Sequence, residues 1–153
     1  MKTIITITLL SVVAFCCSCT EKDCFTPPEV FRLVVHHSDG TSAISADNQS
    51  NVKLFIVTAT NNTIEMAIDV LQHYDSATDI NTFYIETAEL PWKSLDGNKN
   101  FLLKIGDSSA NLFVDVTAQT VDRCAIHPYN LVSYNGTPVN EYNSDIGAFV
   151  ATE

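Results

Sequence analysis

The chain has 153 residues, the length of a single domain, and 46% of them are hydrophobic. Eighteen acidic residues outnumber eight basic ones, which gives a net charge of -10. Nucleic-acid binding depends on patches of Lys and Arg, so this balance excludes a nucleic-acid partner. It also argues against close contact of the protein surface with anionic lipid.

The first residues have the layout of a bacterial secretory signal. Lys2 precedes an apolar run over residues 3–15, and polar residues occupy positions 20–23. The apolar run is too short for a membrane-spanning helix, which needs about 20 apolar residues. We therefore expect residues 1–18 to be a signal peptide that is cleaved.

The end of this segment resembles the lipobox of bacterial lipoproteins, in which a small residue precedes the cysteine that is acylated. Ser18 followed by Cys19 fits this pattern. The resemblance implies that Cys19 becomes the new N-terminus and carries lipid, palmitate included, that anchors the protein to a membrane. An ordinary secretory signal cut nearby is the alternative.

The charged residues at positions 21–23 resemble the export signal of Bacteroidetes-type lipoproteins. The resemblance implies an outer-membrane location with exposure at the cell surface. The periplasmic face is the alternative, because charged residues are also common in solvated linkers. In either case, residues 19–29 would form an acylated tether, and the domain would occupy residues 30–153.

Two cysteines, Cys24 and Cys124, remain once the signal is removed and Cys19 is acylated. Disulfides persist in oxidising compartments, so we expect these two to be bonded. A bridge closing a loop of roughly 100 residues contributes about 4 to 5 kcal/mol in the chain-entropy model, less any strain. Two unrelated thiols are the alternative, since bonding requires their Cα atoms to lie close together.

Apolar and polar residues alternate with a period of two along most of the remaining chain, which predicts strands. The predicted strands, in chain order, are residues 31–36, 52–57, 64–71, 82–87, 101–105, 112–117, 129–134 and, more weakly, 146–151. Residues 64–71 also fit helical spacing, with Asn62 and Glu65 as a capping box. We favour a strand there because the neighbouring segments are strands.

Seven or eight short strands separated by turns predict an all-β fold, an antiparallel β-sandwich of immunoglobulin-like architecture. A small β-barrel is the alternative. Turn residues lie at 61–62, 106–109 and 135–136. The longest predicted loops are residues 73–81 and 88–100.

The chain as a whole resembles small Bacteroidetes-type lipoproteins with a single β-domain. The resemblance lies in residues 24–28, in residues 101–107, and in Cys124 ahead of residues 129–136. It implies a secreted, lipid-anchored β-domain, and it supports the pairing of Cys24 with Cys124. It implies no particular activity.

We expect no enzymatic activity, cofactor or metal site. The serine-nucleophile motif G-x-S-x-G does not occur. His36 and His37 would point to opposite faces of a strand and so could not share one metal ion. Cys24 and Cys124, the cysteines left after the expected cleavage and acylation, have no zinc-type spacing, and pairs of carboxylates are expected in so acidic a chain.

Aromatic residues supply the candidate ligand-binding site. Trp92, the single tryptophan, could line a binding face with Tyr84 and Tyr129. Rings with a polar tip suit interfaces with proteins or glycans. Tyr134 and Tyr142 could extend this face. The alternative is that Trp92 plugs one end of the sandwich.

Ser76 is a candidate for modification. With its neighbours Asp75 and Ala77 it resembles the acceptor for O-glycosylation in exported Bacteroidetes-type proteins. Its position in a predicted loop would suit this role.

These features predict a non-catalytic binding or accessory module of the cell envelope, with protein or glycan ligands. A structural or assembly lipoprotein of the outer membrane is the alternative. An exposed aromatic patch around Trp92 would favour recognition, and an unpaired edge strand would favour assembly by strand addition.

The predicted anchor can be tested by mass spectrometry of the N-terminal peptide of protein purified from its native membrane. We expect the mature chain to begin at Cys19 and to carry acyl chains, because Ser18 and Cys19 form the lipobox junction. The full-length chain with Cys19→Ala should stay unacylated. A free, unmodified N-terminus at another residue would contradict the anchor.

Overall fold

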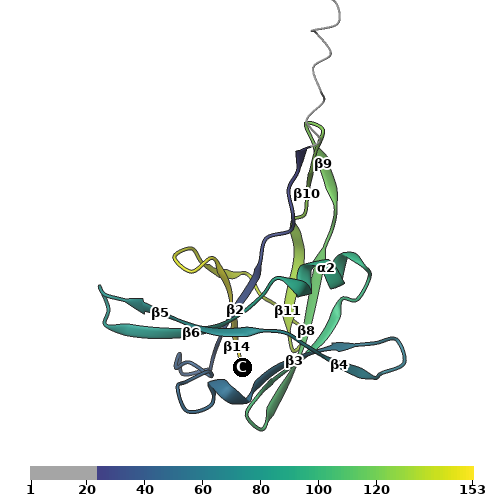
Figure 1. Cartoon of the computed structure of the whole chain (residues 1–153). Coiled ribbons are helices and arrows are strands. Elements are labelled where there is room, and N and C mark those ends of the chain that lie inside the picture. The colour runs from purple at the N-terminus through teal and green to yellow at the C-terminus, as the bar shows by residue number, and fades with distance from the viewer. Residues whose placement is uncertain (1–23) are drawn as a thin grey trace, which may run out of the picture.

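A computed structural model of the protein describes residues 24–153. The predicted signal peptide, Cys19 and the charged residues 21–23 lie outside the described residues. The described chain is mostly strand, arranged in three sheets (Figure 1). The predicted all-β sandwich is confirmed, and within residues 24–153 the sheets do not close into a barrel.

The first layer of the sandwich is a five-stranded sheet with the order β13-β14-β2-β6-β5. Its neighbouring strands are antiparallel except for the parallel pair β14 and β2. In chain order its strands are β2 (Phe31–His36), β5 (Asp69–Asp75), β6 (Ile80–Thr87), β13 (Glu141–Asn143) and β14 (Ala148–Thr152).

The second layer is a six-stranded sheet with the order β12-β11-β8-β7-β3-β4, and all its pairs are antiparallel. In chain order its strands are β3 (Val52–Val57), β4 (Thr63–Met66), β7 (Asn100–Ile105), β8 (Ser108–Val116), β11 (Tyr129–Tyr134) and β12 (Thr137–Pro138).

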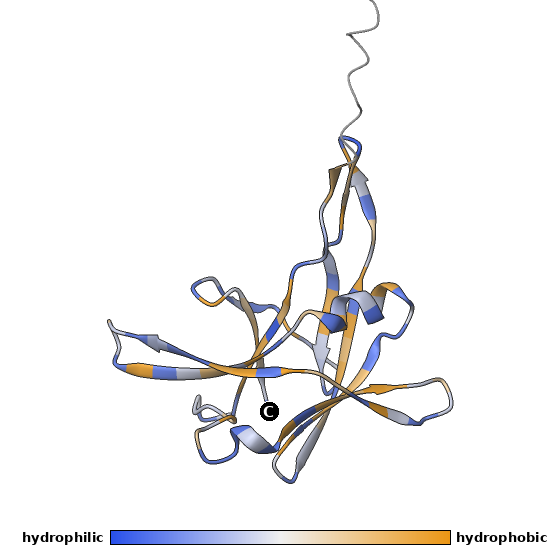
Figure 2. Ribbon diagram, in the orientation of Figure 1, coloured by the Kyte–Doolittle hydropathy of each residue, from blue (hydrophilic) through white to orange (hydrophobic). Residues whose placement is uncertain are grey.

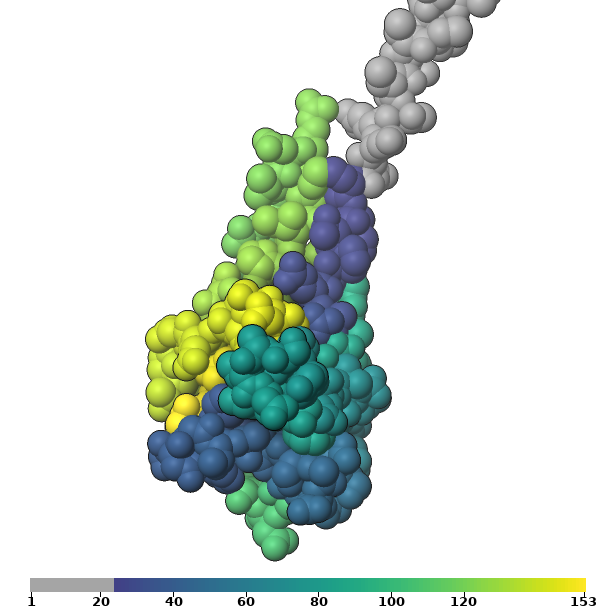
Figure 3. All heavy atoms as spheres, turned by 90° about the vertical axis from the view of Figure 1, so that its left-hand side faces the viewer, coloured from purple at the N-terminus to yellow at the C-terminus, as the bar shows by residue number. Residues whose placement is uncertain are grey.

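The third sheet, which we call the arm, has the order β1-β10-β9. Its strands are β1 (Cys24–Phe25), β9 (Gln119–Val121) and β10 (Cys124–Ile126). The arm projects beyond the body of the sandwich (Figures 1 and 3). None of its residues belongs to the buried core. Two short helices, η1 (Gln49–Asn51) and α2 (Glu89–Leu95), complete the described chain.

The core lies between the two large sheets, where one face of each strand is apolar. Phe31, Leu33 and Val35 of β2 point inward and are fully buried. They meet Leu103 of β7 and Val114 of β8 in the same core. Figure 2 shows this alternation of hydrophobic and hydrophilic residues along the sandwich strands. The period-two pattern of the sequence therefore predicts correctly which residues of these strands face the core.

Residues 64–71 form strand rather than helix, but in two separate strands. β4 pairs with β3 in the six-stranded sheet, whereas β5 pairs with β6 in the five-stranded sheet. Residues 67–68 cross between the layers, and Ile68 packs against the core. The alternation continues across this crossing, so the sequence pattern does not reveal it.

The predicted loop over residues 73–81 is wrong. β5 continues to Asp75 and β6 begins at Ile80, so only residues 76–79 turn. Asp75 closes this turn, because its carboxylate accepts hydrogen bonds from Ala77 N (2.8 Å) and Thr78 Oγ1 (2.7 Å). Asp79 adopts the positive φ of 57° that ends it.

The predicted loop over residues 88–100 is also wrong, because it contains α2 and the start of β7. Pro91 lies in the first turn of α2, where proline removes no helical hydrogen bond. Leu90 is fully buried in the core and holds the helix against the sandwich. The sequence does not show that Leu90 is buried. This burial favours the helix, although proline is common in loops.

Several strands of two or three residues were not predicted. These are β1, β9, β10, β12 and β13, which are too short to show a period of two. β1 lies within the predicted tether, where Cys24 and Phe25 pair with β10. The predicted turn at residues 135–136 is confirmed, with φ values of 49° for Asn135 and 80° for Gly136.

Ser94 of α2 completes the hydrogen bonding of β8. β7 pairs with β8 only as far as Asn100 opposite Phe113. Beyond that point the buried Ser94 hydroxyl donates to Val114 O (2.9 Å) and accepts from Val116 N (2.8 Å). One side chain thus replaces the missing strand, because buried backbone groups need partners.

We expect Ser94→Ala to lower the free energy of unfolding by about 1 to 3 kcal/mol, because it leaves two buried backbone groups of β8 without this partner. Chemical denaturation monitored by circular dichroism measures the change. Ser109→Ala, at an exposed position of the same strand, should be close to neutral. Equal stability of the two variants would contradict the role of Ser94.

Candidate functional site

Three rings meet on the surface where α2 lies beside the base of the arm. Phe25, Trp92 and His127 form this group, which we call the Trp92 cluster. The centroid of Phe25 lies 6.1 Å from that of Trp92 and 5.6 Å from that of His127, and Trp92 and His127 are 6.1 Å apart. Phe25 is 60% exposed and Trp92 is 42% exposed. The cluster is therefore a solvent-facing aromatic patch.

The arm holds two of these rings in place. Cys24 and Cys124 are joined by the predicted disulfide, with their Cα atoms 4.7 Å apart. The bond lies next to the short parallel pairing of β1 with β10. Below it, Thr26 N donates to Ala125 O (3.1 Å), and His127 Nδ1 lies 2.7 Å from Thr26 O. These contacts hold the segments that carry Phe25 and His127 beside each other.

Trp92 does not fill the end of the sandwich. Among the residues of α2, Leu90 is the one that enters the buried core, and Pro91 and Ser94 are also buried. Trp92 faces the arm and solvent instead. One side of α2 therefore packs on the core, and the other side carries the indole ring of Trp92.

Tyr129 does not join the Trp92 cluster. Its ring packs against Phe31 (5.9 Å between centroids) and Phe149 (5.3 Å), and its hydroxyl donates to Glu29 O (2.7 Å). Burial raises the pKa of the Tyr129 hydroxyl above its usual value. These contacts attach the segment that enters β2 to the sandwich, which is a structural role.

Tyr84 lies on the outer face of the five-stranded sheet. There it packs against the buried group of Val34 and its neighbours. Close by, Arg32 pairs with Glu86, and this hydrogen bond raises the pKa of Arg32. Trp92, Tyr84 and Tyr129 therefore occupy three separate environments rather than the single face that the sequence suggested.

Phe25 and His127 are the members of the cluster that sequence reasoning missed. Each lies within three residues of a disulfide cysteine, Phe25 after Cys24 and His127 after Cys124. The predicted disulfide was the available signal, since it brings these two segments together. Nothing in the sequence places Trp92 beside them.

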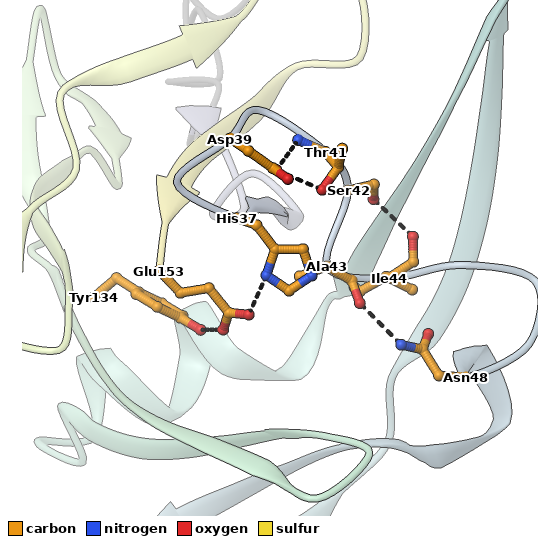
Figure 4. A network of polar contacts seen from close by, with 9 residues as sticks. All are labelled: His37, Asp39, Thr41, Ser42, Ala43, Ile44, Asn48, Tyr134 and Glu153. Carbon is orange, nitrogen blue, oxygen red and sulfur yellow. Dashed lines mark hydrogen bonds and ion pairs between the residues drawn. The ribbon is translucent and has the colours of Figure 1, made fainter.

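A polar network ties the loop after β2 to the end of the chain (Figure 4). Tyr134 donates its hydroxyl to Glu153 Oε2 (3.2 Å), and His37 Nδ1 lies 2.8 Å from Glu153 Oε1. Burial raises the pKa of Tyr134. In the same loop, the pKa of Asp39 is lowered because Thr41 donates to its carboxylate. His37 and Tyr134 thus have structural partners.

Ser76 is exposed in the turn between β5 and β6. The neighbouring Asp75 carboxylate accepts hydrogen bonds within the turn, and the one from Thr78 lowers the pKa of Asp75 most. Ser76 is therefore accessible on a well-defined turn beside a charged carboxylate.

A shallow cavity of about 740 Å³ lies on the outer face of the six-stranded sheet, and we call it the amide groove. Three turns surround it, after β3, before β7 and after β11. Asparagine is its most frequent lining residue, and the others include Phe113 and Lys99. The lining asparagines are Asn61, Asn98, Asn100, Asn111 and Asn135.

The lining of the amide groove contains no carboxylate, histidine or cysteine. Lys99 is its one charged residue, and its Nζ lies 2.7 Å from Asp115 Oδ1. The groove therefore offers mainly neutral hydrogen-bond donors and acceptors.

Within residues 24–153, no three His, Cys, Asp or Glu side chains gather closely enough to hold a metal ion. None of the helices described is long and apolar enough to cross a membrane. Comparison with protein-family models, curated proteins and solved structures finds no significant match.

Because Trp92 is the single tryptophan, its fluorescence reports on the cluster directly. We expect Cys124→Ser to shift the emission to longer wavelength and to raise quenching by acrylamide. The arm contributes no residue to the core, so loss of the disulfide should free Phe25 and His127 from the indole.

Phe25→Ala should change the fluorescence in the same direction while leaving the disulfide intact. Val121→Ala, at an exposed position on β9 away from the ring contacts, is the control. Unchanged quenching in both Cys124→Ser and Phe25→Ala would show that the arm does not shield Trp92.

Proposed function

We propose that the protein is a lipid-anchored, non-catalytic binding module of the cell envelope that recognises protein or glycan ligands. The observation that carries this proposal is the Trp92 cluster, an aromatic patch that is exposed and yet held by a disulfide. Exposed aromatic residues of this kind are frequent at the energetic centres of interfaces.

The cluster suits binding because its rings are fixed before a ligand arrives. Phe25 follows a disulfide cysteine, and Trp92 extends from a helix whose other side is buried. Ordering flexible side chains costs about 0.5 to 1.5 kcal/mol each on binding, and prior fixation removes part of this cost. A ligand can therefore gain from contact with these rings at little entropic expense.

The predicted anchor supports a site near the membrane. Cys19 precedes Cys24 by five residues, which span at most about 18 Å when fully extended. A lipid on Cys19 would thus keep the arm close to the membrane surface. The ligand would then be a membrane-proximal component of the envelope, such as a neighbouring protein or a surface glycan.

A structural or assembly role is the second candidate, and the β5 edge favours it. In the part of the chain that the structure describes, β5 pairs with β6 alone and leaves its other edge open. Leu71 is 37% exposed and Tyr74 is 55% exposed on this strand. An open edge can accept a strand from a partner, although Asp69 and Asp75 at its ends act against unspecific pairing.

Affinity capture of the intact lipoprotein from its native membrane tests both candidates. We expect Trp92→Ala to reduce recovery of co-purifying envelope components by at least tenfold, because a central aromatic residue commonly contributes 2 kcal/mol or more, roughly 30-fold in affinity. Leu71→Lys, which places a charge on the β5 edge, should leave recovery unchanged.

Loss of partners in Leu71→Lys alone would favour assembly through the β5 edge. Unchanged capture of the same partners by Trp92→Ala would contradict recognition through the Trp92 cluster. Equal melting temperatures of the two variants and the original protein are required before the comparison is made.

A further inference from the structure

We propose that the amide groove is a binding site for a neutral oligosaccharide. This site is separate from the Trp92 cluster, and its assignment does not rest on the proposed function. The inference follows from the strand register, from the chemistry of the lining side chains and from their charge.

The floor of the groove is one row of residues across the sheet. Asn100 of β7 is paired with Phe113 of β8, which is paired with Ser133 of β11. Their neighbours in sequence, such as Phe101 and Leu112, enter the core, so these three face outward. The row thus presents an exposed amide beside a half-buried aromatic ring, and the Ser133 hydroxyl next to that ring is buried.

The surrounding turns are held by their own hydrogen bonds. Asn135 Oδ1 accepts from Asn111 N (2.9 Å), and Asn135 N donates to Asn111 O (2.7 Å). On the opposite side, Asn61 N donates to Thr58 O (2.9 Å), and Asn98 N donates to Lys93 O (2.9 Å). The groove is therefore preformed, which lowers the entropic cost of binding.

The amides match the hydrogen-bonding groups of a sugar. Each asparagine offers one carbonyl acceptor and two N–H donors, and each sugar hydroxyl is both donor and acceptor. Among the hydrogen bonds within residues 24–153, none uses the side-chain amide of Asn98, Asn100 or Asn111. These groups remain available to a ligand.

Phe113 supplies the apolar contact that such a ligand also needs. Its ring is half-buried in the middle of the row, between Asn100 and Ser133. The C–H face of a pyranose can pack on an aromatic face while its hydroxyls reach the amides around it. A volume of about 740 Å³ lies within the range of about 300 to 1,000 Å³ that is usual for small-ligand sites.

Charge selects a neutral ligand over an acidic one. Lys99 is paired with Asp115 and so offers no free positive charge in the groove. The whole chain carries a net charge of -10, which disfavours the approach of a polyanion. The same lack of carboxylates in the lining makes this a site of binding rather than of hydrolysis.

The test uses the full chain purified in lauryldimethylamine oxide, a detergent without a sugar headgroup. The protein is applied to an array that carries both neutral and acidic oligosaccharides, and the strongest neutral binder is then titrated by calorimetry. We expect binding of neutral oligosaccharides, and at least a tenfold weaker affinity in Asn100→Ala and in Phe113→Ala.

Matched controls lie outside the groove. Phe55→Ala removes a ring from the same outer face of the sheet, where Lys104 covers it, and Gln72→Ala removes an exposed amide from β5. Both should bind as the original protein does. Asn100 is exposed, so Asn100→Ala remains informative if Phe113→Ala fails to fold.

Three results would overturn the proposal. They are the absence of neutral binders on the array, binding of acidic oligosaccharides alone, and unchanged affinity in Asn100→Ala. If Trp92→Ala abolishes glycan binding while Asn100→Ala and Phe113→Ala retain it, the glycan belongs to the Trp92 cluster, and the proposed function stands without this second site.

Discussion

Burial of the apolar faces of two sheets against each other is the constraint on which the rest of the structure depends. Phe31, Leu33 and Val35 of β2 are fully buried between the sheets, and they fix which face of each strand points outward. A shift of one residue would exchange the two faces. The outward direction of Asn100 and Phe113 is thus a consequence of packing on the inner face.

The arm obeys a different constraint because it has no share in the core. Its three short strands are held together by the bond between Cys24 and Cys124 and by a few backbone hydrogen bonds. The exposed Trp92 cluster lies where this arm meets α2. The covalent bond helps to keep partly exposed rings ordered, and such order lowers the entropic cost of binding.

The proposed recognition surfaces differ in chemistry and in position. The Trp92 cluster is aromatic and lies where the arm meets α2, whereas the amide groove is polar and lies on the outer face of the six-stranded sheet. In the first, affinity would come mainly from ring contact. In the second, it would come mainly from hydrogen bonds to amides such as Asn100.

The sequence by itself determined the all-β class, the inner face of most strands and the turn at residues 135–136, because period-two patterning and turn chemistry are local signals. It also predicted the disulfide, because two cysteines remain after the expected signal and the acylated Cys19 are set aside. Trp92 was identified as a candidate, but its partners Phe25 and His127 were not. Only the tertiary structure decided α2, the crossing at residues 67–68 and the row from Asn100 to Ser133. These depend on the burial of Leu90 and on which distant strands become neighbours, and both are set by packing across the whole domain.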